Sequence, residues 1–333
     1  MKITIIGDGG WGTALSVLLS KKGISVTLWG AFADYINILK QKRENLKFLP
    51  GITIPESVKF TDSLEIALKG AEIVVLAVPA QYMRGVLRKI KKYNCALIKF
   101  LTVAKGIELE TAKFMSEVIC LELGKVKLAV LSGPNIASEV AQGIPSACVC
   151  ASLDKDLSLE IQEIFTSNLF RVYTHNDLIG VELGGALKNV IAIACGICDG
   201  LGFGANTKAA LLTRGLAEIT RLGRALGADY KTFSGLSGMG DLVATCFSDK
   251  SRNRYLGEQI GKGKKLSEIL SGTEMVIEGV VTTKSALKVA TEHNLSLPIT
   301  KEVFNVLFEN KKPGLAVMDL MSRAKKEETD SPD

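Results

Sequence analysis

A glycine-rich turn near the amino terminus constrains the fold more than any other feature of the sequence. The turn GDGGWG, residues 7–12, directly follows the β-rich run KITII and opens a helical pattern that ends at Gly23. The next run, SVTLW, is typical of a second strand. Strand, turn, helix and strand form one βαβ unit, which predicts two parallel strands joined by a crossover helix.

The glycines of this turn fit the spacing G-x-G-x-x-G in the context where that spacing binds dinucleotides. Gly7 allows the tight turn, Gly9 lets the backbone approach a pyrophosphate, and Gly12 lets the helix pack against the strand. Backbone amides at the start of the helix then face the anion. The turn therefore predicts NAD or NADP as the cofactor.

The end of the second predicted strand leaves the choice between NAD and NADP open. Trp29, Gly30 and Ala31 offer neither an acid for a ribose 2′-hydroxyl nor an arginine for a 2′-phosphate. Asp34 is an alternative ribose partner, but it is displaced along the chain.

The β-rich runs are confined to the first half of the chain. Residues 72–79, 96–104, 127–133 and 147–152 resemble strands separated by helix-sized segments, whereas helical patterns prevail from about Asp177. We therefore expect an α/β protein with a Rossmann-type, doubly wound, largely parallel sheet over residues 1–176. An all-helical domain over 177–327 and a frayed polar tail over 328–333 should follow. The helices are expected at 177–199, 206–226, 251–262, 283–293 and 299–309.

Composition narrows the class of protein. The net charge of +6 is modest and shows no basic stripe, so we expect no nucleic-acid partner. The apolar run at the amino terminus is too short for a secretory signal. The longest apolar stretch, Val190 to Cys198, falls far short of the roughly 20 residues of a bilayer span, so we expect a cytoplasmic protein without one.

The seven cysteines are interpreted as free thiols, most of them in apolar runs. Cys195 and Cys198 form a C-x-x-C, but no second pair accompanies them and the chain has only two histidines. We therefore assign this pair to packing and expect no metal site.

The segment GVELGGALKNVIAIACGICDGLG, residues 180–202, resembles one apolar helix with Lys188 in its middle. A buried lysine requires either a compensating interaction or a functional role, because removing an ammonium group from water costs several kcal/mol. One interpretation is that Lys188 snorkels or pairs with Glu182 or Asp199. The other is that burial beside the cleft between two domains lowers its pKa for acid–base catalysis.

Two further segments carry charge at positions suited to a ligand. Lys105 follows a predicted parallel strand, where open α/β sheets bind ligands, although it would also fit a surface turn. Ser251, Arg252 and Asn253 open a helical segment and together suit a phosphate, although Ser251 would also serve as a simple N-cap. Asp241, after the glycine-rich run GLSGMG, is hard to explain as a core residue.

With these residues in view, the chain resembles the bacterial NAD(P)-dependent glycerol-3-phosphate dehydrogenases from Met1 to about Glu327. The resemblance rests on long segments such as GDGGWGTALS, LSGPNIASEVAQGIPSA, GVELGGALKNVIAIACGICDGLG and SRNRYLGEQIGKG. It implies reversible hydride transfer between NAD(P)H and dihydroxyacetone phosphate, which supplies sn-glycerol 3-phosphate for phospholipid synthesis. It also implies a homodimer.

The same resemblance implies roles for particular residues. Lys188 stands where the family has its proton acceptor. The residues implied to hold the substrate are Lys105, Gly133, Asn135, Lys188, Asp241, Ser251, Arg252 and Asn253. Those implied to hold the cofactor are Gly7, Gly9, Gly10, Trp11, Gly12, Lys105, Ala137, Arg252, Val276 and Glu278.

Two positions depart from the family pattern, and two other functions compete with it. Ala31 stands where relatives usually have a basic residue, and Asn135 replaces a serine or threonine.

A nucleotide-sensing module would need the glycine turn but not the two lysines. A 3-hydroxyacid dehydrogenase would bind a carboxylate, whereas Arg252 and its neighbours favour a phosphate.

Overall fold

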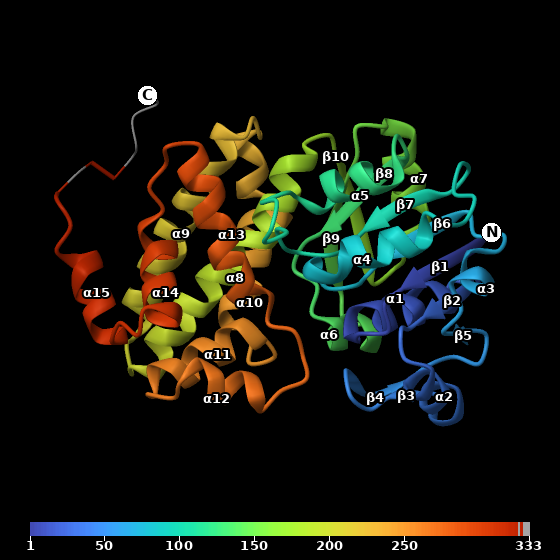
Figure 1. Cartoon of the computed structure of the whole chain (residues 1–333), viewed down its shortest axis with the longest axis horizontal. Coiled ribbons are helices and arrows are strands. Elements are labelled where there is room, and N and C mark those ends of the chain that lie inside the picture. The colour runs from blue at the N-terminus through green and yellow to red at the C-terminus, as the bar shows by residue number, and fades with distance from the viewer. Residues whose placement is uncertain (326, 329–333) are drawn as a thin grey trace.

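The first half of the chain forms a sheet, which runs through the right-hand part of Figure 1. The computed structural model describes residues 1–325 and 327–328, and within them this sheet has eight strands in the order β10-β9-β8-β7-β6-β1-β2-β5. Adjacent strands in this sheet are parallel, except for the pair β8 and β9, which is antiparallel. The predicted α/β class with a largely parallel sheet is therefore confirmed. The strands are β1 (Lys2–Ile6), β2 (Ser25–Trp29), β5 (Lys59–Thr61), β6 (Ile73–Leu76), β7 (Lys99–Thr102), β8 (Lys127–Ser132), β9 (Ser146–Ala151) and β10 (Phe170–His175).

The sheet is covered on both faces, and its central strands are buried at nearly every position. Along β6, Ile73 and Val75 join one hydrophobic core, while Val74 and Leu76 join another on the opposite face. Helix α1 packs into the first core and α4 into the second. The segments around the sheet are α1 (Gly10–Lys21), α2 (Ala33–Lys42), the hairpin β3 (Glu44–Asn45) and β4 (Leu49–Thr53), α3 (Leu64–Leu68), α4 (Ala80–Ile90), α5 (Met115–Leu123), α6 (Ala137–Gln142) and α7 (Lys155–Phe165).

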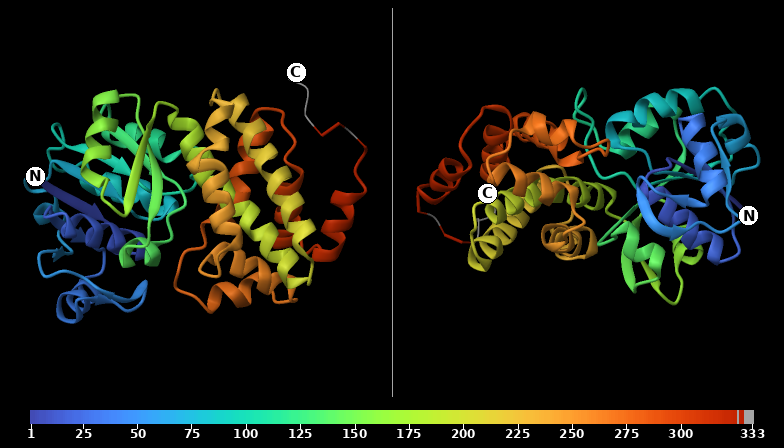
Figure 2. Two further views of the ribbon diagram at one scale, coloured as in Figure 1. Left: turned by 180° about the vertical axis from the view of Figure 1, so that it is seen from behind. Right: turned by 90° about the horizontal axis from the view of Figure 1, so that it is seen from below.

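The second half of the chain is helical. We call residues 1–175 the sheet lobe and the residues from Leu178 onward the helical lobe; the views in Figure 2 agree that the two lie side by side. The helices are α8 (Leu178–Gly200), α9 (Ala205–Ala225), α10 (Asp241–Phe247), α11 (Arg252–Gly261), α12 (Leu266–Ser271), α13 (Glu278–Glu292), α14 (Pro298–Phe308) and α15 (Pro313–Met321), with a 3₁₀ turn at Tyr230–Ser234 and a π turn at Leu236–Gly240 before α10.

Helix α8 is the central element of the helical lobe. Asp177 caps its start by accepting a hydrogen bond from the amide of Gly180 at 2.8 Å. Its length and composition would allow it to cross a membrane, but 89% of its most apolar window is buried inside the protein. It is therefore the core helix of this lobe.

Helix α8 crosses α11 at very short range because glycines stand at the crossing. A methyl group built on Gly196 would lie 2.0 Å from the carbonyl oxygen of Arg254, and one built on Gly257 would lie 2.1 Å from that of Ile193. The two backbones are thus in contact, which no residue with a side chain would permit. The crossing brings the start of α11 next to the middle of α8.

Several details differ from the sequence-based expectations. Strands β3, β4, β5 and β10 and helices α10, α12 and α15 were not predicted, and α13 begins at Glu278 rather than 283. The end of β10 and the start of α8 are compatible with the expected boundary at 176/177, which stays a prediction. The expected tail at 328–333 lies outside the described residues apart from Glu328. All seven cysteines, which lie in the described ranges, are free; five are buried, Cys95 is half-buried and Cys120 is exposed.

Candidate active site

The loops after β1, β7 and β8 meet at one edge of the sheet, because parallel strands end on the same side. The loop after β1 is the glycine turn, and the loop after β7 carries Lys105. The loop after β8 carries Gly133 and Asn135. This edge faces the helical lobe, since Lys105 contacts Asp241 at the start of α10. The candidate site therefore lies between the two lobes.

The glycine turn has the geometry that its spacing predicts. Gly7 has a φ of +122°, and a methyl group there would lie 2.7 Å from the carbonyl oxygen of Ala77. A methyl group on Gly12 would lie 1.9 Å from the carbonyl oxygen of Gly7. At Gly9, by contrast, no described atom lies within 4 Å of such a group, so the backbone there is open to a ligand. Helix α1 begins at Gly10, where its amides suit an anion.

Lys188 is buried in the middle of α8, with 7% of its surface exposed. Its ammonium group pairs with Asp241 Oδ1 and donates to the hydroxyl of Thr245 at 2.8 Å. The alternative pairing with Glu182 or Asp199 was wrong. Glu182 accepts hydrogen bonds from Ser116. Asp199 pairs with Lys208 and Arg254 and lies about three turns along α8 from Lys188, too far for a direct contact.

Asp241 joins the two lysines that the sequence singled out. Lys105 Nζ lies 2.7 Å from Asp241 Oδ2 and 2.8 Å from the carbonyl oxygen of Gly133. Only 2% of the surface of Asp241 is exposed, and a single buried carboxylate therefore lies between two ammonium groups. Alternatives in which Lys105 is a surface lysine or Asp241 a plain core residue do not fit this geometry.

The environment lowers the pKa of Lys188 to about 8. Burial is the main cause, because it penalises the charged form, and the positive charge of Lys105 acts in the same direction. The carboxylate of Asp241 opposes both effects. Lys188 can therefore exchange a proton near neutral pH, which an unperturbed lysine cannot do.

A pair of glycines brings α8 to this position. A methyl group on Gly185 would lie 2.7 Å from the hydroxyl of Ser132 and 3.4 Å from Cγ of Lys105. One on Gly184 would lie 2.5 Å from the carbonyl oxygen of Ser237, just before α10. The run GGALK thus lets α8 approach both the end of β8 and the turn that presents Asp241.

The start of α11 lies beside these charges. The side chain of Ser251 caps the helix by accepting from the amide of Arg254 at 3.2 Å, so the simple N-cap interpretation is also satisfied. Arg252 Nη1 donates to the carbonyl of Val276 at 2.9 Å. Asn253 is buried; it donates to Asn189 Oδ1 at 2.8 Å and accepts from the amide of Gly279 at 2.9 Å.

Asn189 connects this helix start to the lysine loop. Its side-chain amide donates to the carbonyl oxygen of Lys105 at 3.2 Å, while its Oδ1 accepts from Asn253. Asn189, which is next to Lys188 in α8, therefore holds both the backbone of Lys105 and the start of α11. Such a network sets the positions of the charged groups before any ligand arrives.

Several buried polar atoms at this edge have no hydrogen-bond partner within the described part of the chain. They are Asp8 Oδ2, Ser132 Oγ, Asn135 Oδ1 and Glu278 Oε2. Unpaired buried atoms are rare in folded proteins and often mark a ligand site. Asn135 donates to the carbonyl of Ala147 at 3.2 Å, and Glu278 Oε1 accepts from the amide of Ala80 at 2.9 Å, so one oxygen of each is free. Polar atoms are therefore available for both predicted ligands.

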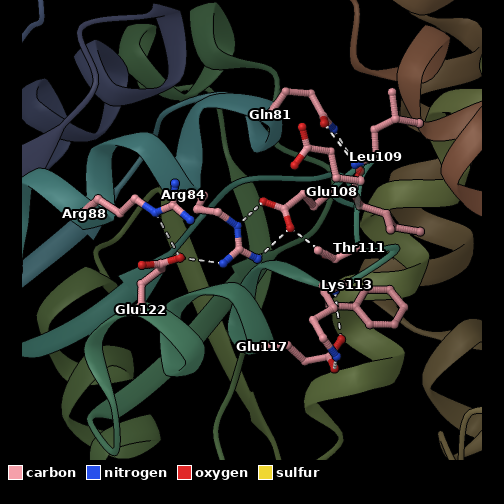
Figure 3. Close-up of polar contacts among 12 residues, drawn as sticks. Gln81, Arg84, Arg88, Glu108, Leu109, Thr111, Lys113, Glu117 and Glu122 are labelled. Carbon is pink, nitrogen blue, oxygen red and sulfur yellow. Dashed lines mark hydrogen bonds and ion pairs between the residues drawn. The ribbon is translucent and has the colours of Figure 1, made fainter.

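The loop that carries Lys105 is fixed to the sheet lobe by an ion-pair network, which Figure 3 shows. Arg84 of α4 makes two hydrogen bonds with the buried carboxylate of Glu108, at 2.7 and 2.8 Å, and a third with Glu122 of α5 at 2.5 Å. The guanidinium group lowers the pKa of Glu108. Gln81 adds hydrogen bonds to the backbone of Ile107 and Leu109. The loop is thus anchored to α4 and, through Arg84, to α5.

The remaining predicted residues belong to the glycine turn, to the start of α6, and to the start of α13 with the residues before it. A methyl group on Gly10 would lie 3.9 Å from Cβ of Ala137, so these two residues are neighbours. Trp11 and Val276 are half-buried. Glu278 lies near the lysine loop, since a methyl group on Gly106 would be 3.1 Å from its Oε2. The structure brings the predicted residues to the edge between the lobes, and their individual roles stay predictions.

Comparison with known proteins identifies the family. The pattern described as "NAD-dependent glycerol-3-phosphate dehydrogenase N-terminus" matches residues 2–158, and the one described as the C-terminus matches residues 177–318. The chain belongs to the NAD-dependent glycerol-3-phosphate dehydrogenase family. It is therefore an oxidoreductase that uses NAD or NADP, as the glycine turn predicted.

Named members of the glycerol-3-phosphate dehydrogenase family are similar over nearly the whole chain. The NAD(P)⁺ enzyme of Chlorobium phaeobacteroides is 48% identical over 331 residues, which cover 98% of this chain and 99% of the relative. That of Thermoanaerobacter sp. is 49% identical over 328 residues, with 98% and 99% coverage. The crystal structure of the glycerol-3-phosphate dehydrogenase from Coxiella burnetii has a TM-score of 0.94 at 38% identity and covers 97% of this chain and 99% of that one.

The candidate site of this dehydrogenase also contains residues that the sequence analysis did not identify. They are Thr245, which accepts from Lys188, Asn189, which connects Lys105 to Asn253, and the unpaired side chains of Ser132 and Asp8. Thr245 follows Asp241 by four residues, and this spacing places both on one face of α10. That spacing and the position of Asn189 next to Lys188 were the available signals.

Proposed function

We propose that this enzyme transfers hydride reversibly between NAD(P)H and dihydroxyacetone phosphate, with Lys188 as the general acid and base. The proposal depends most on the buried pairing of Lys188 and Lys105 with Asp241. A reaction that interconverts a hydroxyl and a carbonyl must move one proton as the hydride moves. The names of the relatives, all glycerol-3-phosphate dehydrogenases, support the substrate.

Lys188 is suited to the proton step by its pKa and its hydrogen bonds. An ammonium group has three N–H donors, and Asp241 and Thr245 engage two of them. The third is available to a substrate oxygen. In reduction the protonated lysine would donate to the developing alkoxide at C2; in oxidation the neutral lysine would take the hydroxyl proton.

The charges around Lys188 suit the phosphate end of the substrate. Lys105, Lys188 and Arg252 outnumber the carboxylates of Asp241 and Glu278, so the site has an excess of positive charge. The start of α11 adds its backbone amides. We assign the phosphate to Ser251, Arg252 and Asn253. Lys105, Gly133 and Asn135 would hold the rest of the molecule, which fixes C2 relative to Lys188.

The residues around the glycine turn suit a dinucleotide, since Gly9 is open and α1 starts with free amides. When bound, the nicotinamide ring donates or accepts the hydride. Gly10, Trp11, Ala137, Val276 and Glu278 would hold the cofactor. The unpaired Oε2 of Glu278 is available to accept a hydrogen bond from it.

Replacing Lys188 tests this function. We expect Lys188→Ala to lower kcat for dihydroxyacetone phosphate by at least about a hundredfold, because the proton donor is lost. Quenching of tryptophan fluorescence by NADH should show unchanged cofactor binding. Lys208→Ala is the matched control, since Lys208 pairs with Asp199 at the far end of α8 and should be dispensable. Normal turnover of Lys188→Ala would exclude the acid–base role.

The wider setting of the activity follows from the family. We propose that the enzyme works in the cytoplasm as a homodimer and supplies sn-glycerol 3-phosphate for phospholipid synthesis. We also propose residues 1–176 as the dinucleotide-binding domain and 177–327 as the substrate-binding domain. The burial of α8 supports the absence of a membrane span.

A further inference from the structure

The glycine turn contains an acidic side chain, Asp8, that no step above uses. It follows Gly7 and lies over the end of β2, because a methyl group built on Gly30 would be 2.4 Å from Asp8 Oδ2. Strand β2 ends at Trp29, so Gly30 is the first residue beyond it. A side chain at position 30 would displace the carboxylate. Asp8 therefore occupies the space that a side chain at the end of β2 would otherwise fill.

The position of Asp8 is fixed, but one oxygen of its carboxylate is unsatisfied. The backbone carbonyl of Asp8 accepts from Asn45 Nδ2 at 2.8 Å, and the fully buried Asn45 also bonds to Thr13 and Tyr35. Asp8 Oδ2 is buried and has no hydrogen-bond partner in residues 1–325 and 327–328. Burial raises the pKa of this carboxyl group, so a hydrogen-bond donor that reached Oδ2 would stabilise the charged form.

The end of β2 is the place where this fold distinguishes the two nicotinamide dinucleotides. An acid there usually accepts a hydrogen bond from the ribose 2′-hydroxyl of NAD, and an arginine pairs with the 2′-phosphate of NADP. Here the strand end consists of Gly30 and Ala31, which provide neither group. We propose that Asp8 takes the place of the missing acid and makes this enzyme prefer NAD to NADP.

The chemistry of the two ligands explains the preference. A 2′-hydroxyl can donate to Asp8 Oδ2, whereas a 2′-phosphate has no proton to donate at neutral pH and is repelled by the carboxylate. Burial of Oδ2 makes this repulsion stronger than it would be in water, and the positive charge of Lys47 offsets part of it.

The cations near this turn are already engaged. Lys47 pairs with Glu274 of the helical lobe and lies over the rings of Tyr35 and Phe48. The guanidinium group of Arg43 donates to the carbonyls of Pro55 and Val58 and pairs with Glu56. Binding a 2′-phosphate would therefore require one of these contacts to be given up.

Cofactor binding by the whole enzyme tests the proposal without any turnover. Both NADH and NADPH quench tryptophan fluorescence through the same reduced nicotinamide, so the two dissociation constants are directly comparable. We expect the wild type to bind NADH about a hundredfold more tightly than NADPH. Asp8→Asn removes the charge and keeps the shape, so the ratio should fall to within about tenfold, mainly through tighter NADPH binding.

Asp34→Asn tests the alternative ribose partner, because it removes the carboxylate from the exposed first turn of α2. Its ratio should equal that of the wild type. Asp8→Ala is a second variant in case Asp8→Asn fails to fold, because an alanine side chain has no polar atom that needs a hydrogen-bond partner.

The proposal is overturned if the wild type binds NADPH as tightly as NADH, if both Asp8 variants keep the wild-type ratio, or if Asp34→Asn changes the ratio as much as they do. It rests on family membership for the use of NAD or NADP. Because it needs neither Lys188 nor a substrate, its failure would leave the proposed reaction standing.

Discussion

At the scale of single residues, the site is organised around Asp241. One of its oxygens binds Lys105 and the other binds Lys188. Because Asp241 is buried, water does not compete with either ammonium group for the carboxylate. A buried carboxylate with two cations leaves one positive charge in excess, which suits an anionic substrate. It also holds the pKa of Lys188 higher than burial alone would leave it.

The dependence of the rate on pH should therefore respond to Asp241. For glycerol 3-phosphate oxidation, Lys188 must be neutral, so kcat should rise with pH around the pKa of about 8. Because Asp241 raises the pKa of Lys188, Asp241→Asn should move the rise to lower pH, whatever it does to the maximal rate. Asp199→Asn, which breaks pairs with Lys208 and Arg254, should leave the profile in place. A shift of the Asp241→Asn profile to higher pH would contradict this assignment.

The sequence could identify the unusual residues but not their partners. Lys188 was conspicuous because a cation interrupted an apolar helix, and Lys105 because it followed a predicted strand. Their common partner lies 53 and 136 residues away along the chain, a separation at which local patterns carry no information. Asp8 was overlooked for a related reason, since its importance depends on the contact with Gly30 across two strands.

At the scale of elements, the crossing of α8 and α11 places the proposed phosphate site beside Lys188. The crossing depends on backbone contact, so it has no room for a methyl group. The sequence predicted both helices but not their crossing, because four glycines at 196, 200, 257 and 261 meet only in the folded chain. Strand β10 was missed because it lies at the sheet edge, carries several polar residues and alternates only briefly between buried and exposed positions.

A pair of glycine substitutions separates packing at this crossing from helix propensity. Gly257→Ala should lower the free energy of unfolding by about 1–3 kcal/mol or more, because the added methyl group meets the backbone of Ile193. Gly85→Ala, on the exposed face of α4 with no described atom within 4 Å of the added group, should raise it by about 0.5–1 kcal/mol. Urea denaturation measures both. Equal effects of the two variants would show that the crossing tolerates the methyl group.

At the scale of the whole molecule, the two lobes share buried contacts. Ile107, Ala112 and Phe114, from the loop that carries Lys105, belong to the hydrophobic core of the helical lobe. Glu182 of α8 accepts hydrogen bonds from the amide and hydroxyl of Ser116 in α5. Neither lobe can unfold without exposing part of the other, so we expect a single cooperative transition.

The positions of the tryptophans make this cooperativity measurable. Both tryptophans, Trp11 and Trp29, lie in the sheet lobe, so their fluorescence reports on that lobe. Far-UV circular dichroism is dominated by helices, most of which lie in the helical lobe. The two signals should change at the same urea concentration. Separate midpoints would show that the lobes unfold independently.

Two buried carboxylates should make the free energy of unfolding depend on pH, which gives a second test of cooperativity. The pKa of Glu182, between the lobes, and that of Glu218, within the helical lobe, are both raised by burial from 4.5 to about 7. A raised carboxyl pKa contributes stability below pH 4.5, and this contribution is lost as the pH rises through 7. Between pH 5 and 8, wild-type stability should therefore fall relative to Glu182→Gln and to Glu218→Gln, by up to about 3 kcal/mol in each case.

Comparing the two variants by fluorescence locates the coupling. If unfolding is one transition, Glu218→Gln must change the pH dependence of the tryptophan signal as much as Glu182→Gln does, although Glu218 bonds to Ile299 and Thr300 inside the helical lobe. If the sheet lobe unfolds by itself, the tryptophan signal will not respond to Glu218→Gln. The first result would mean that the site between the lobes is lost only in global unfolding. Lys105 and Asp241 would then separate only when both lobes unfold.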